Sequence, residues 1–454
     1  MARCEHQTLC FEVSRHAIEA GYSQPTLPKR LAAAQPSGRA PSSTRSRAGE
    51  RDGDASQPPL DSTFAAPLVL PGDELAWNPK YPPQSLRSWT GAKYRNPVTS
   101  QRRTIYVVPP PKVDESVAFV SSWAQPTGVK DRVTAPAMEE VLAYLQAFYH
   151  GLEVKLMRTS DLHFDTWDKR ARTKRTQPHN LAAVSLEIGS EAVRIRTRPS
   201  HDGVFSGQLN LNDLLDVAMS ILPEDAYALV MLVDHDLYED EEDDFCCGRA
   251  YGGSRVAVVS MARYHPLLDR RQGVKREHAW PASHCKTYID RCCNEESAKV
   301  QPKKRQRKGA ITAEDTAHRK ESPETAIGDA VAAYRSHSTE AGDKTMDALL
   351  SALWLGRVCK TASHELGHCF GLDHCVYYAC IMQGTAGLSE DARQPPYLCP
   401  VDMAKLLKAT GVSEREWVEA MLGFCERYEE AEGDGLFAAF AAWLRVRFRQ
   451  TEVV

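Results

Sequence analysis

Three histidines and a glutamate are spaced in a way that suits a metal ion. His364 and His368 lie four residues apart, which places two side chains on the same face of an α-helix. Glu365, one step round the helix, would reach a water molecule on an ion held by the two imidazoles. Gly371 follows where a residue without Cβ can turn left-handed and end the helix, so that His374 comes back as a third ligand.

This ligand set predicts hydrolysis of peptide bonds. Three neutral imidazoles leave the fourth position of a tetrahedral zinc ion open to water, and the ion lowers the pKa of that water toward about 7. Glu365 would accept a proton as the water attacks a carbonyl and would then deliver it to the departing amine. The alternative is a set of ordinary core histidines, but a chance match to the whole pattern is rare.

The first two histidines are predicted to lie on one long helix. No proline occurs between Pro323 and Pro395. Apolar residues recur there mostly at three- and four-residue intervals, which is the helical period. They are Met346, Leu349, Leu350, Leu353, Val358, Ala362 and Leu366.

Strands and helices alternate before this long helix. The continuous apolar run 227–233 is typical of a strand buried on both faces, and 255–260 reads as a second strand. Residues 104–108 predict a short strand that is ended by three prolines. Residues 138–149 and 209–221 have the spacing of amphipathic helices. This order predicts an α/β fold with a largely parallel sheet.

Three cysteines follow the third histidine closely. Cys375, Cys380 and Cys399 supply three soft thiolates within about 25 residues, which suits a second, closed, structural zinc. Met382 follows Cys380 by two residues, where an apolar side chain could form a floor beneath the histidine site. The sequence therefore predicts two metal sites close together.

The run HELGHCFGLDHCVYYACIMQGTAG and the later LCPVDMAKL closely resemble the archaemetzincins, a metzincin-type branch of zinc metallopeptidases. In that family the long HExxHxxGxxH motif is followed directly by a cysteine, another cysteine five residues on, a methionine turn and a closing CxxC pair. The resemblance implies a twisted mixed sheet backed by helices, with a smaller irregular C-terminal subdomain that begins at Gly371. It also implies that a catalytic zinc ion is bound by His364, His368 and His374, and that Glu365 is the general base. Met382 would form the methionine turn. A structural zinc ion would be bound by Cys375, Cys380 and Cys399.

One position departs from the family pattern. The last cysteine of the closing pair falls on Asp402. A carboxylate oxygen can bind zinc, so a site of three thiolates and Asp402 is one interpretation. In the other, Asp402 caps a helix over 403–409, and water or a nearby cysteine completes the site.

The resemblance also implies where a substrate binds. In metzincin-type enzymes the strand before the active-site helix borders the cleft, and that role falls here on Arg255–Ser260. Such an edge could hold an extended peptide by main-chain hydrogen bonds. The expected partner is a peptide or protein substrate.

Composition and charge exclude some other classes of protein. The 454 residues carry a formal net charge of -4, so there is no global attraction to nucleic acid or to an anionic membrane. The chain contains no run of about 18 apolar residues and its start lacks a secretory signal, so we expect an intracellular, cytoplasmic protein. The basic block 303–308 has the composition of a nuclear-import signal, and equally that of a solvated charged run.

The chain divides into a tail and one domain. Residues 1–62 are predicted to be a disordered N-terminal tail, because Pro, Ser, Ala, Arg and Gly dominate much of the segment. Residues 63–454 would form the metallopeptidase domain, with a flexible charged insertion at 266–341. The closing segment 413–454 predicts two amphipathic helices.

Two further functions compete with a zinc peptidase. One is a catalytically silent, zinc-stabilised protein-binding module, which has the same ligands. The other is a nucleic-acid zinc finger built from His374 and the three cysteines. The zinc finger explains neither Glu365 nor the paired histidines, so nucleic acid is not the expected partner.

Overall fold

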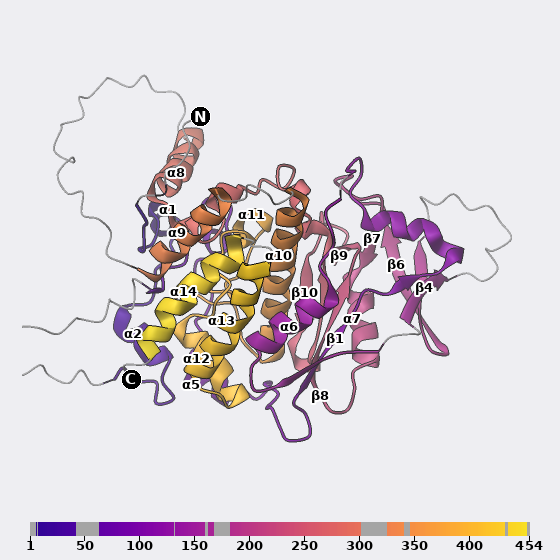
Figure 1. The fold of residues 1–454 in the computed structure, drawn as a ribbon, viewed down its shortest axis with the longest axis horizontal. Coiled ribbons are helices and arrows are strands. Elements are labelled where there is room, and N and C mark those ends of the chain that lie inside the picture. The colour runs from indigo at the N-terminus through magenta and orange to yellow at the C-terminus, as the bar shows by residue number, and fades with distance from the viewer. Residues whose placement is uncertain are drawn as a thin grey trace, which may run out of the picture.

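Two β-sheets and a group of helices surround one long helix in the computed structural model of the protein (Figure 1). The helices α12 to α14 lie on one side of the long helix, α10, and the strands lie on the other. The α/β class predicted from the sequence is therefore confirmed. The structure describes residues 6, 8–41, 63–130, 132–158, 162–167, 182–300, 325–339, 346–431 and 435–451.

The first sheet is the one that carries the active-site helix. Its order is β10-β11-β8-β1-β3, and all neighbours are parallel except β10 and β11. The strands are β1 (Thr104–Val108), β3 (Glu153–Leu156), β8 (Ala226–Val233), β10 (Gly248–Tyr251) and β11 (Val256–Ser260). The predicted strands at 104–108, 227–233 and 255–260 are all present, and the sheet is largely parallel as expected.

A second, mixed sheet packs against the first one through a shared apolar core. Its order is β2-β4-β5-β6-β7-β9, and the central pairs from β4 to β7 are antiparallel. No pattern in the sequence predicted this sheet. Its strands are β2 (Lys112–Val113), β4 (Leu162–Thr166), β5 (Ala183–Ile188), β6 (Glu191–Arg198), β7 (Gln208–Asn210) and β9 (Asp236–Tyr238).

Strand β8 is buried on both faces, as its continuous apolar run predicts. Ala228 and Val230 face one core, which contains α6 (Met138–Phe148) and α10. Leu229 and Met231 face the other core, which contains α7 (Leu211–Ser220) and side chains of the second sheet. The first sheet is thus the middle layer of the fold, and it gives α10 a rigid support.

Helix α10 (Met346–Cys369) is the predicted long helix, and it is 24 residues long. The Trp354 indole donates to the carbonyl of Met261 at 2.8 Å, which ties the helix to the chain that leaves β11. Gly371 follows the helix with φ 75, the left-handed conformation that the sequence predicts there.

The C-terminal part covers the active-site helix. An irregular stretch after Gly371 contains only the short α11 (Leu388–Asp391), and three longer helices follow. They are α12 (Pro400–Thr410), α13 (Glu414–Ala431) and α14 (Gly435–Thr451). The two helices predicted within 413–454 are confirmed.

The predicted disordered tail over 1–62 is wrong for residues 8–41. Helices α1 (Arg15–Glu19) and α2 (Leu27–Ala33) lie in this segment. They precede α4 (Glu74–Trp77) and α5 (Leu86–Gly91). Residues 42–62 lie outside the described part of the chain.

Docking onto the body of the protein explains why the N-terminal segment is ordered. The Tyr22 hydroxyl donates to the carbonyl of Val376 at 2.7 Å, and the Gln24 amide donates to the carbonyl of Tyr377 at 2.6 Å. Ala17 is fully buried. The segment lacks apolar residues for a core of its own, but tertiary contacts tie it down.

The predicted flexible insertion over 266–341 is also wrong where the structure describes it. After short 3-10 turns, α8 (Lys286–Val300) and α9 (Ala326–Thr339) form, and α9 packs against α14. Trp280, near the start of the insertion, is buried in the main core. The basic block 303–308 lies outside the described residues.

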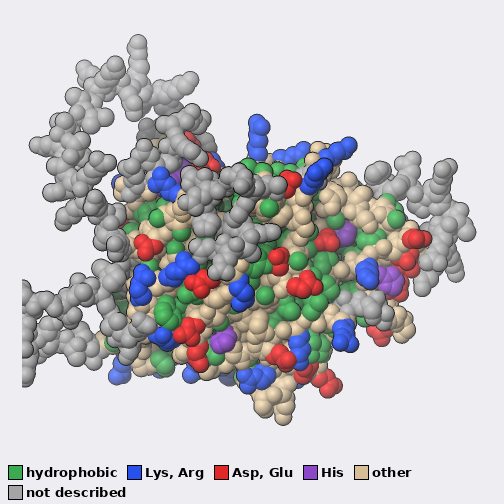
Figure 2. Space-filling model, in the orientation of Figure 1, with side chains coloured by type: hydrophobic (Ala, Val, Ile, Leu, Met, Phe, Trp, Pro, Cys, Tyr) green, Lys and Arg blue, Asp and Glu red, His purple; other side chains and the backbone are tan. Residues whose placement is uncertain are grey.

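The surface shows no concentration of one charge on the face seen in Figure 2, where acidic and basic side chains are interspersed. This agrees with the small formal net charge of -4. Among the helices that the structure describes, none is both long and apolar enough to cross a lipid bilayer.

Candidate active site

Three imidazoles meet at the end of α10, as the sequence predicts. His364 and His368 lie on the last turns of the helix, and His374 returns after the turn at Gly371. One nitrogen from each ring lies within 4.8 Å of the other two. The Nε2 atoms of His364 and His368 are 3.0 Å apart.

The outer nitrogens of the first two rings are occupied by backbone carbonyls. Nδ1 of His364 donates to the carbonyl of Ile381 at 2.6 Å, and Nδ1 of His368 donates to the carbonyl of Leu372 at 2.7 Å. A carbonyl can only accept, so the proton of each ring is on Nδ1. The two Nε2 atoms therefore face each other as lone pairs.

This arrangement fits a cation. Two lone pairs at 3.0 Å repel each other unless a positive ion lies between them. Zinc bound to nitrogen at about 2.0–2.1 Å in a tetrahedron places two nitrogens about 3.3 Å apart, which is close to the observed separation. The residues present therefore suit zinc.

Burial keeps the first two rings neutral. It lowers the pKa of His364 well below its usual value and that of His368 to about 4, and the neighbouring imidazoles lower both further. For His374, burial lowers the pKa but the hydrogen bond and charge of Glu74 outweigh it, so the pKa is raised.

Glu74 is a site residue that the sequence analysis missed. Its Oε1 lies 3.0 Å from Nδ1 of His374 and accepts a hydrogen bond from it. The backbone N–H of Glu74 in turn donates to the buried carboxylate of Glu390 at 2.9 Å. Glu74 lies 300 residues before His374, so no local spacing could have linked them.

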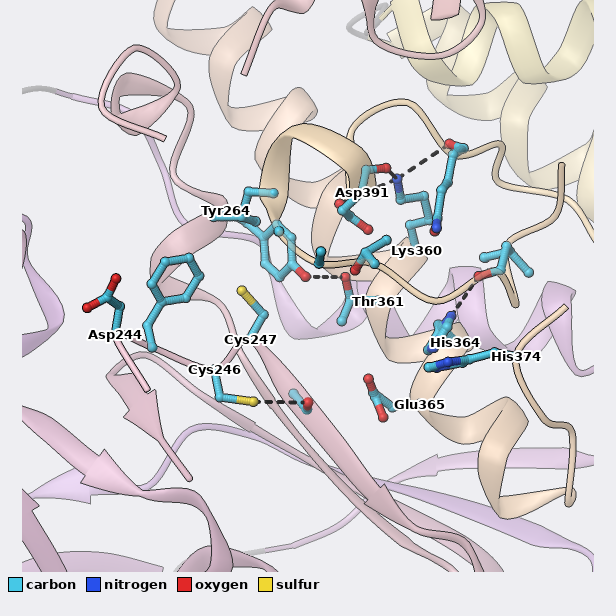
Figure 3. Close-up of a pocket in the computed structure, with 18 residues that line it drawn as sticks. Asp244, Cys246, Cys247, Tyr264, Lys360, Thr361, His364, Glu365, His374 and Asp391 are labelled. Carbon is cyan, nitrogen blue, oxygen red and sulfur yellow. Dashed lines mark hydrogen bonds and ion pairs between the residues drawn. The ribbon is translucent and has the colours of Figure 1, made fainter. Parts of the chain in front are cut away.

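Glu365 lies beside the histidines and faces a pocket (Figure 3). Its side chain is largely buried, and this burial raises the pKa of its carboxyl to about 7, although His374 and Arg249 oppose the shift. Strand β10 runs past it at Gly248, where a Cβ would come within 3.3 Å of Cγ of Glu365. The absence of a side chain at Gly248 leaves room for the glutamate.

The cleft extends to both sides of this glutamate. A pocket of about 440 Å³ and another of about 660 Å³ share Gly248, His364, Glu365 and His374 in their walls. Peptide-sized space therefore flanks the imidazoles on two sides.

Of the two edge strands of the first sheet, β10 and β3, the one that borders the cleft is β10, and the prediction that Arg255–Ser260 fills this role is wrong. Strand β11 is paired on both sides, with β10 and with β8. The chain turns back at Gly252–Ser254, so β10 becomes the terminal strand. Four residues with mixed polarity gave too weak a pattern to predict this strand.

Met382 lies beneath the active-site helix. A Cβ on Gly367 would come within 2.6 Å of Sδ of Met382, so the two residues are in direct contact. The N–H of Cys375 donates to the carbonyl of Met382 at 2.7 Å and closes the loop between them. The structure thus places this buried methionine where the sequence analysis expected an apolar floor.

The predicted cysteine cluster also assembles. Cys375, Cys380, Cys399 and Asp402 are all buried, and one ligand atom of each lies within 4.8 Å of the others. The Sγ atoms of Cys375 and Cys399 are 3.5 Å apart, near the roughly 3.8 Å that two thiolates on one zinc require. These residues can hold a second metal ion.

Asp402 faces the thiols and does not cap a helix. Helix α12 begins at Pro400, and Asp402 is already inside it with no capping hydrogen bond. Its Oδ2 lies 3.4 Å from Sγ of both Cys380 and Cys399. Its Oδ1 accepts from Lys405 at 2.7 Å. Of the two interpretations left open by the sequence, the capping role is therefore excluded.

Comparison with known proteins supports a zinc peptidase family. The model for peptidase family M54 matches residues 345–408, which contain both clusters. Archaemetzincin-2 of Homo sapiens is 24% identical over 369 residues, which cover 81% of this chain and 76% of that protein.

Other relatives carry the same family name. Archaemetzincin-1 of Homo sapiens is 25% identical over 252 residues, or 54% of this chain and 41% of that protein. A solved archaemetzincin from Methanopyrus kandleri is 16% identical, covering 69% of this chain and 98% of that one, with a TM-score of 0.31. The match to peptidase family M54 at residues 345–408 and the similarity to archaemetzincins along most of the chain together support the archaemetzincin family of zinc metallopeptidases.

Proposed function

We propose that the chain hydrolyses peptide bonds with catalytic zinc on His364, His368 and His374 and with Glu365 as the general base. Zinc peptidase activity follows from the family, and the residue roles are what we propose here. The observation that carries the proposal is the convergence of unprotonated imidazole nitrogens beside a buried carboxylate.

The chemistry divides between the ion and the chain. When bound, zinc lowers the pKa of water toward about 7 and polarises a carbonyl. Glu365 takes one proton from the attacking water as its oxygen forms a bond with the scissile carbon. The C–N bond then breaks, and Glu365 returns the proton to the leaving nitrogen. The products are a carboxylic acid and an amine, and the glutamate is regenerated.

The substrate would lie along β10. As the terminal strand of the sheet, β10 can offer main-chain hydrogen bonds to an extended peptide. Gly248 lies where this strand passes Glu365, so a bound backbone can approach the carboxylate closely. The two pockets on either side of Glu365 would receive the flanking side chains.

We also propose a structural zinc on Cys375, Cys380, Cys399 and Asp402. Its support is the close approach of three thiols and one carboxylate oxygen in a fully buried site. Lys405 pairs with the other oxygen of Asp402 and offsets part of the negative charge of this ligand set. The chain would then bind about two zinc ions.

The experiment that tests the catalytic assignment compares Glu365→Gln with the wild-type protein. We expect the variant to lose peptide hydrolysis by a factor of at least about 100 while its zinc content stays at the wild-type value. Peptide cleavage is measured by mass spectrometry and zinc by elemental analysis. Glu224→Gln, on an exposed loop, is the matched control for the loss of one carboxylate.

Two results would count against the proposal. If Glu365→Gln cleaves peptides at the wild-type rate, Glu365 is not the base. If the zinc-loaded wild-type protein cleaves nothing in a broad peptide library, the alternative of a catalytically silent binding module is favoured.

The role of Asp402 has its own test. If Asp402 binds the structural zinc, Asp402→Cys gives four thiolates and should hold the ion more tightly, whereas Asp402→Asn should hold it more weakly. Chelator competition followed by elemental analysis measures both. Equal zinc retention in both variants would show that Asp402 does not bind the ion.

A further inference from the structure

The smaller of the two active-site pockets is lined by two oppositely charged residues, Lys360 and Asp391. It has a volume of about 440 Å³ and extends from Glu365 to Lys360 and Asp391 (Figure 3). Apolar side chains also line it, namely those of Phe245, Ile381 and Leu388. A pocket beside the catalytic glutamate would receive a substrate side chain next to the cleaved bond.

Carboxyl groups outnumber Lys and Arg side chains in the described wall of this pocket. Asp244, Glu365 and Asp391 carry carboxyl groups, and Lys360 is the one Lys or Arg among the described lining residues. The zinc ion would add its positive charge at the Glu365 end of the pocket, so Asp244 and Asp391 are the carboxylates that could pair with a positively charged substrate side chain.

The Lys360 ammonium contacts oxygen atoms within the protein. Its ammonium donates to the backbone carbonyl of Asp391, lies 3.4 Å from the carbonyl of Gln394, and lies 3.5 Å from Oδ2 of Asp391. The first contact is a hydrogen bond and the other two are longer, so the buried ammonium is held among oxygen atoms of the protein itself. Lys360 is thus not free to bind an acidic substrate side chain.

The Asp391 carboxylate is only partly satisfied. Its contact with Lys360, at 3.5 Å, is longer than an ordinary hydrogen bond, and its side chain is 14% exposed. Burial is the main cause of the raised pKa of Cys247 and of Tyr264, and the charge of the Asp391 carboxylate contributes to both shifts. Both of these residues line the pocket, so the carboxylate faces its interior.

We propose that this pocket binds a lysine or arginine side chain adjacent to the scissile bond, with Asp391 as the acceptor for its charged end. The apolar walls would hold the methylene stem, and the carboxylate would pair with the ammonium or guanidinium. A purely apolar side chain would cover the Asp391 carboxylate without replacing its water, which carries a desolvation cost. This assignment of a substrate class rests on the proposed peptidase function.

The first test is the cleavage profile of the zinc-loaded wild-type protein on an equimolar peptide library, mapped by mass spectrometry. We expect Lys or Arg at one position next to the cleaved bond to be enriched about tenfold or more over Leu and Glu, as a charge-assisted hydrogen bond would give. Cleavage with apolar or acidic residues preferred at both flanking positions overturns this inference and leaves the peptidase function intact. No cleavage overturns the proposed function itself.

The second test assigns the preference to Asp391. For Asp391→Asn, the ratio of kcat/KM for a Lys peptide to that for the matching Leu peptide should fall about tenfold or more. Glu242→Gln, in the exposed acidic loop next to Asp244, is the control and should keep the wild-type ratio. An unchanged ratio in Asp391→Asn overturns the inference.

A double variant controls for a loss of stability in the single variant. Asp391→Asn removes the counter-ion of the buried Lys360, so the single variant risks instability. Lys360→Met combined with Asp391→Asn removes both charges together, and we expect the same loss of the Lys preference. If this folded double variant keeps the preference, Asp391 does not determine it. If neither variant folds, the wild-type cleavage profile decides.

Discussion

At the scale of single residues, the geometry of the histidine site depends on what each outer nitrogen binds. Two rings use backbone carbonyls, from Ile381 and Leu372, which no substitution removes directly. The third ring, His374, uses the side chain of Glu74. A carboxylate at this position fixes the tautomer and the direction of the ring and makes the ring a more basic ligand. Of the three hydrogen-bond partners of the zinc-binding rings, Glu74 is therefore the one that a mutation can remove directly.

Glu74→Ala should weaken binding of the catalytic zinc by about 10- to 100-fold. The affinity for zinc falls because, in the variant, no side chain orients the His374 ring or holds its proton on Nδ1. Zinc affinity is measured by chelator competition, and only one of the two expected ions should become easier to remove. Glu224→Ala, on the surface, provides the control. Unchanged release of both ions would contradict the assigned role of Glu74.

At the scale of elements, α10 and the loop that carries Met382 act as one unit. The loop supplies the carbonyl of Ile381 that orients His364, and Met382 packs against Gly367 of the helix. The contact is so close that only glycine fits at this helical position. The helix accepts a residue of poor helical propensity because the loop must approach closely.

Gly367→Ala should lower the free energy of unfolding by about 1–3 kcal/mol, despite the better helical propensity of alanine. The new Cβ would come within 2.6 Å of Sδ of Met382. Denaturant unfolding of zinc-matched samples measures the change. Gly423→Ala on α13 is the matched comparison, because its Cβ would meet nothing within 4 Å, and it should raise stability by up to about 1 kcal/mol. A Gly367→Ala protein as stable as Gly423→Ala would refute the close contact.

At the scale of the whole molecule, segments far apart in the chain are joined through buried polar groups. His284 lies in the segment predicted to be a flexible insertion, and its Nε2 donates to the carbonyl of Ala66 at 3.1 Å. Burial lowers the pKa of His284 to about 4 from an ordinary 6.5. The folded protein therefore holds this ring neutral under conditions in which the unfolded chain would protonate it.

Because folding lowers the pKa of His284, the free energy of unfolding should fall as the pH falls. A histidine whose pKa is depressed by folding contributes full stability above about pH 6.5 and loses it as the pH falls toward about 4. Between pH 8 and pH 5, His284 should account for a loss of about 2 kcal/mol.

His284→Gln keeps a donor for the carbonyl of Ala66 but does not titrate. We therefore expect its unfolding free energy to fall by about 2 kcal/mol less than that of the wild type between pH 8 and pH 5. Denaturant titrations at the two pH values measure the difference, and metal ligands contribute equally to both proteins. The exposed His201→Gln is the control. Identical pH dependence in wild type and His284→Gln would exclude this contribution.

Much of the site could be predicted because its parts are close in sequence. His364, Glu365 and His368 lie on one helix, which the helical spacing of its apolar residues predicts. His374 and the first two cysteines follow within one turn and one short loop. The strands at 104–108, 227–233 and 255–260 could be predicted for the same reason, because each is a short run with a clear apolar pattern. The edge strand, four residues long and of mixed polarity, could not.

The sequence by itself determined the chemistry of the ligands, the long helix and the buried strands, since these depend on residue type and local period. Only the tertiary structure decided that Glu74 orients His374, that β10 forms the edge, and that Asp391 faces the pocket beside Glu365. It also decided that residues 8–41 are ordered. These features come from contacts between segments far apart in the chain. Such contacts are selected by how the whole core packs, which no local pattern of residues records.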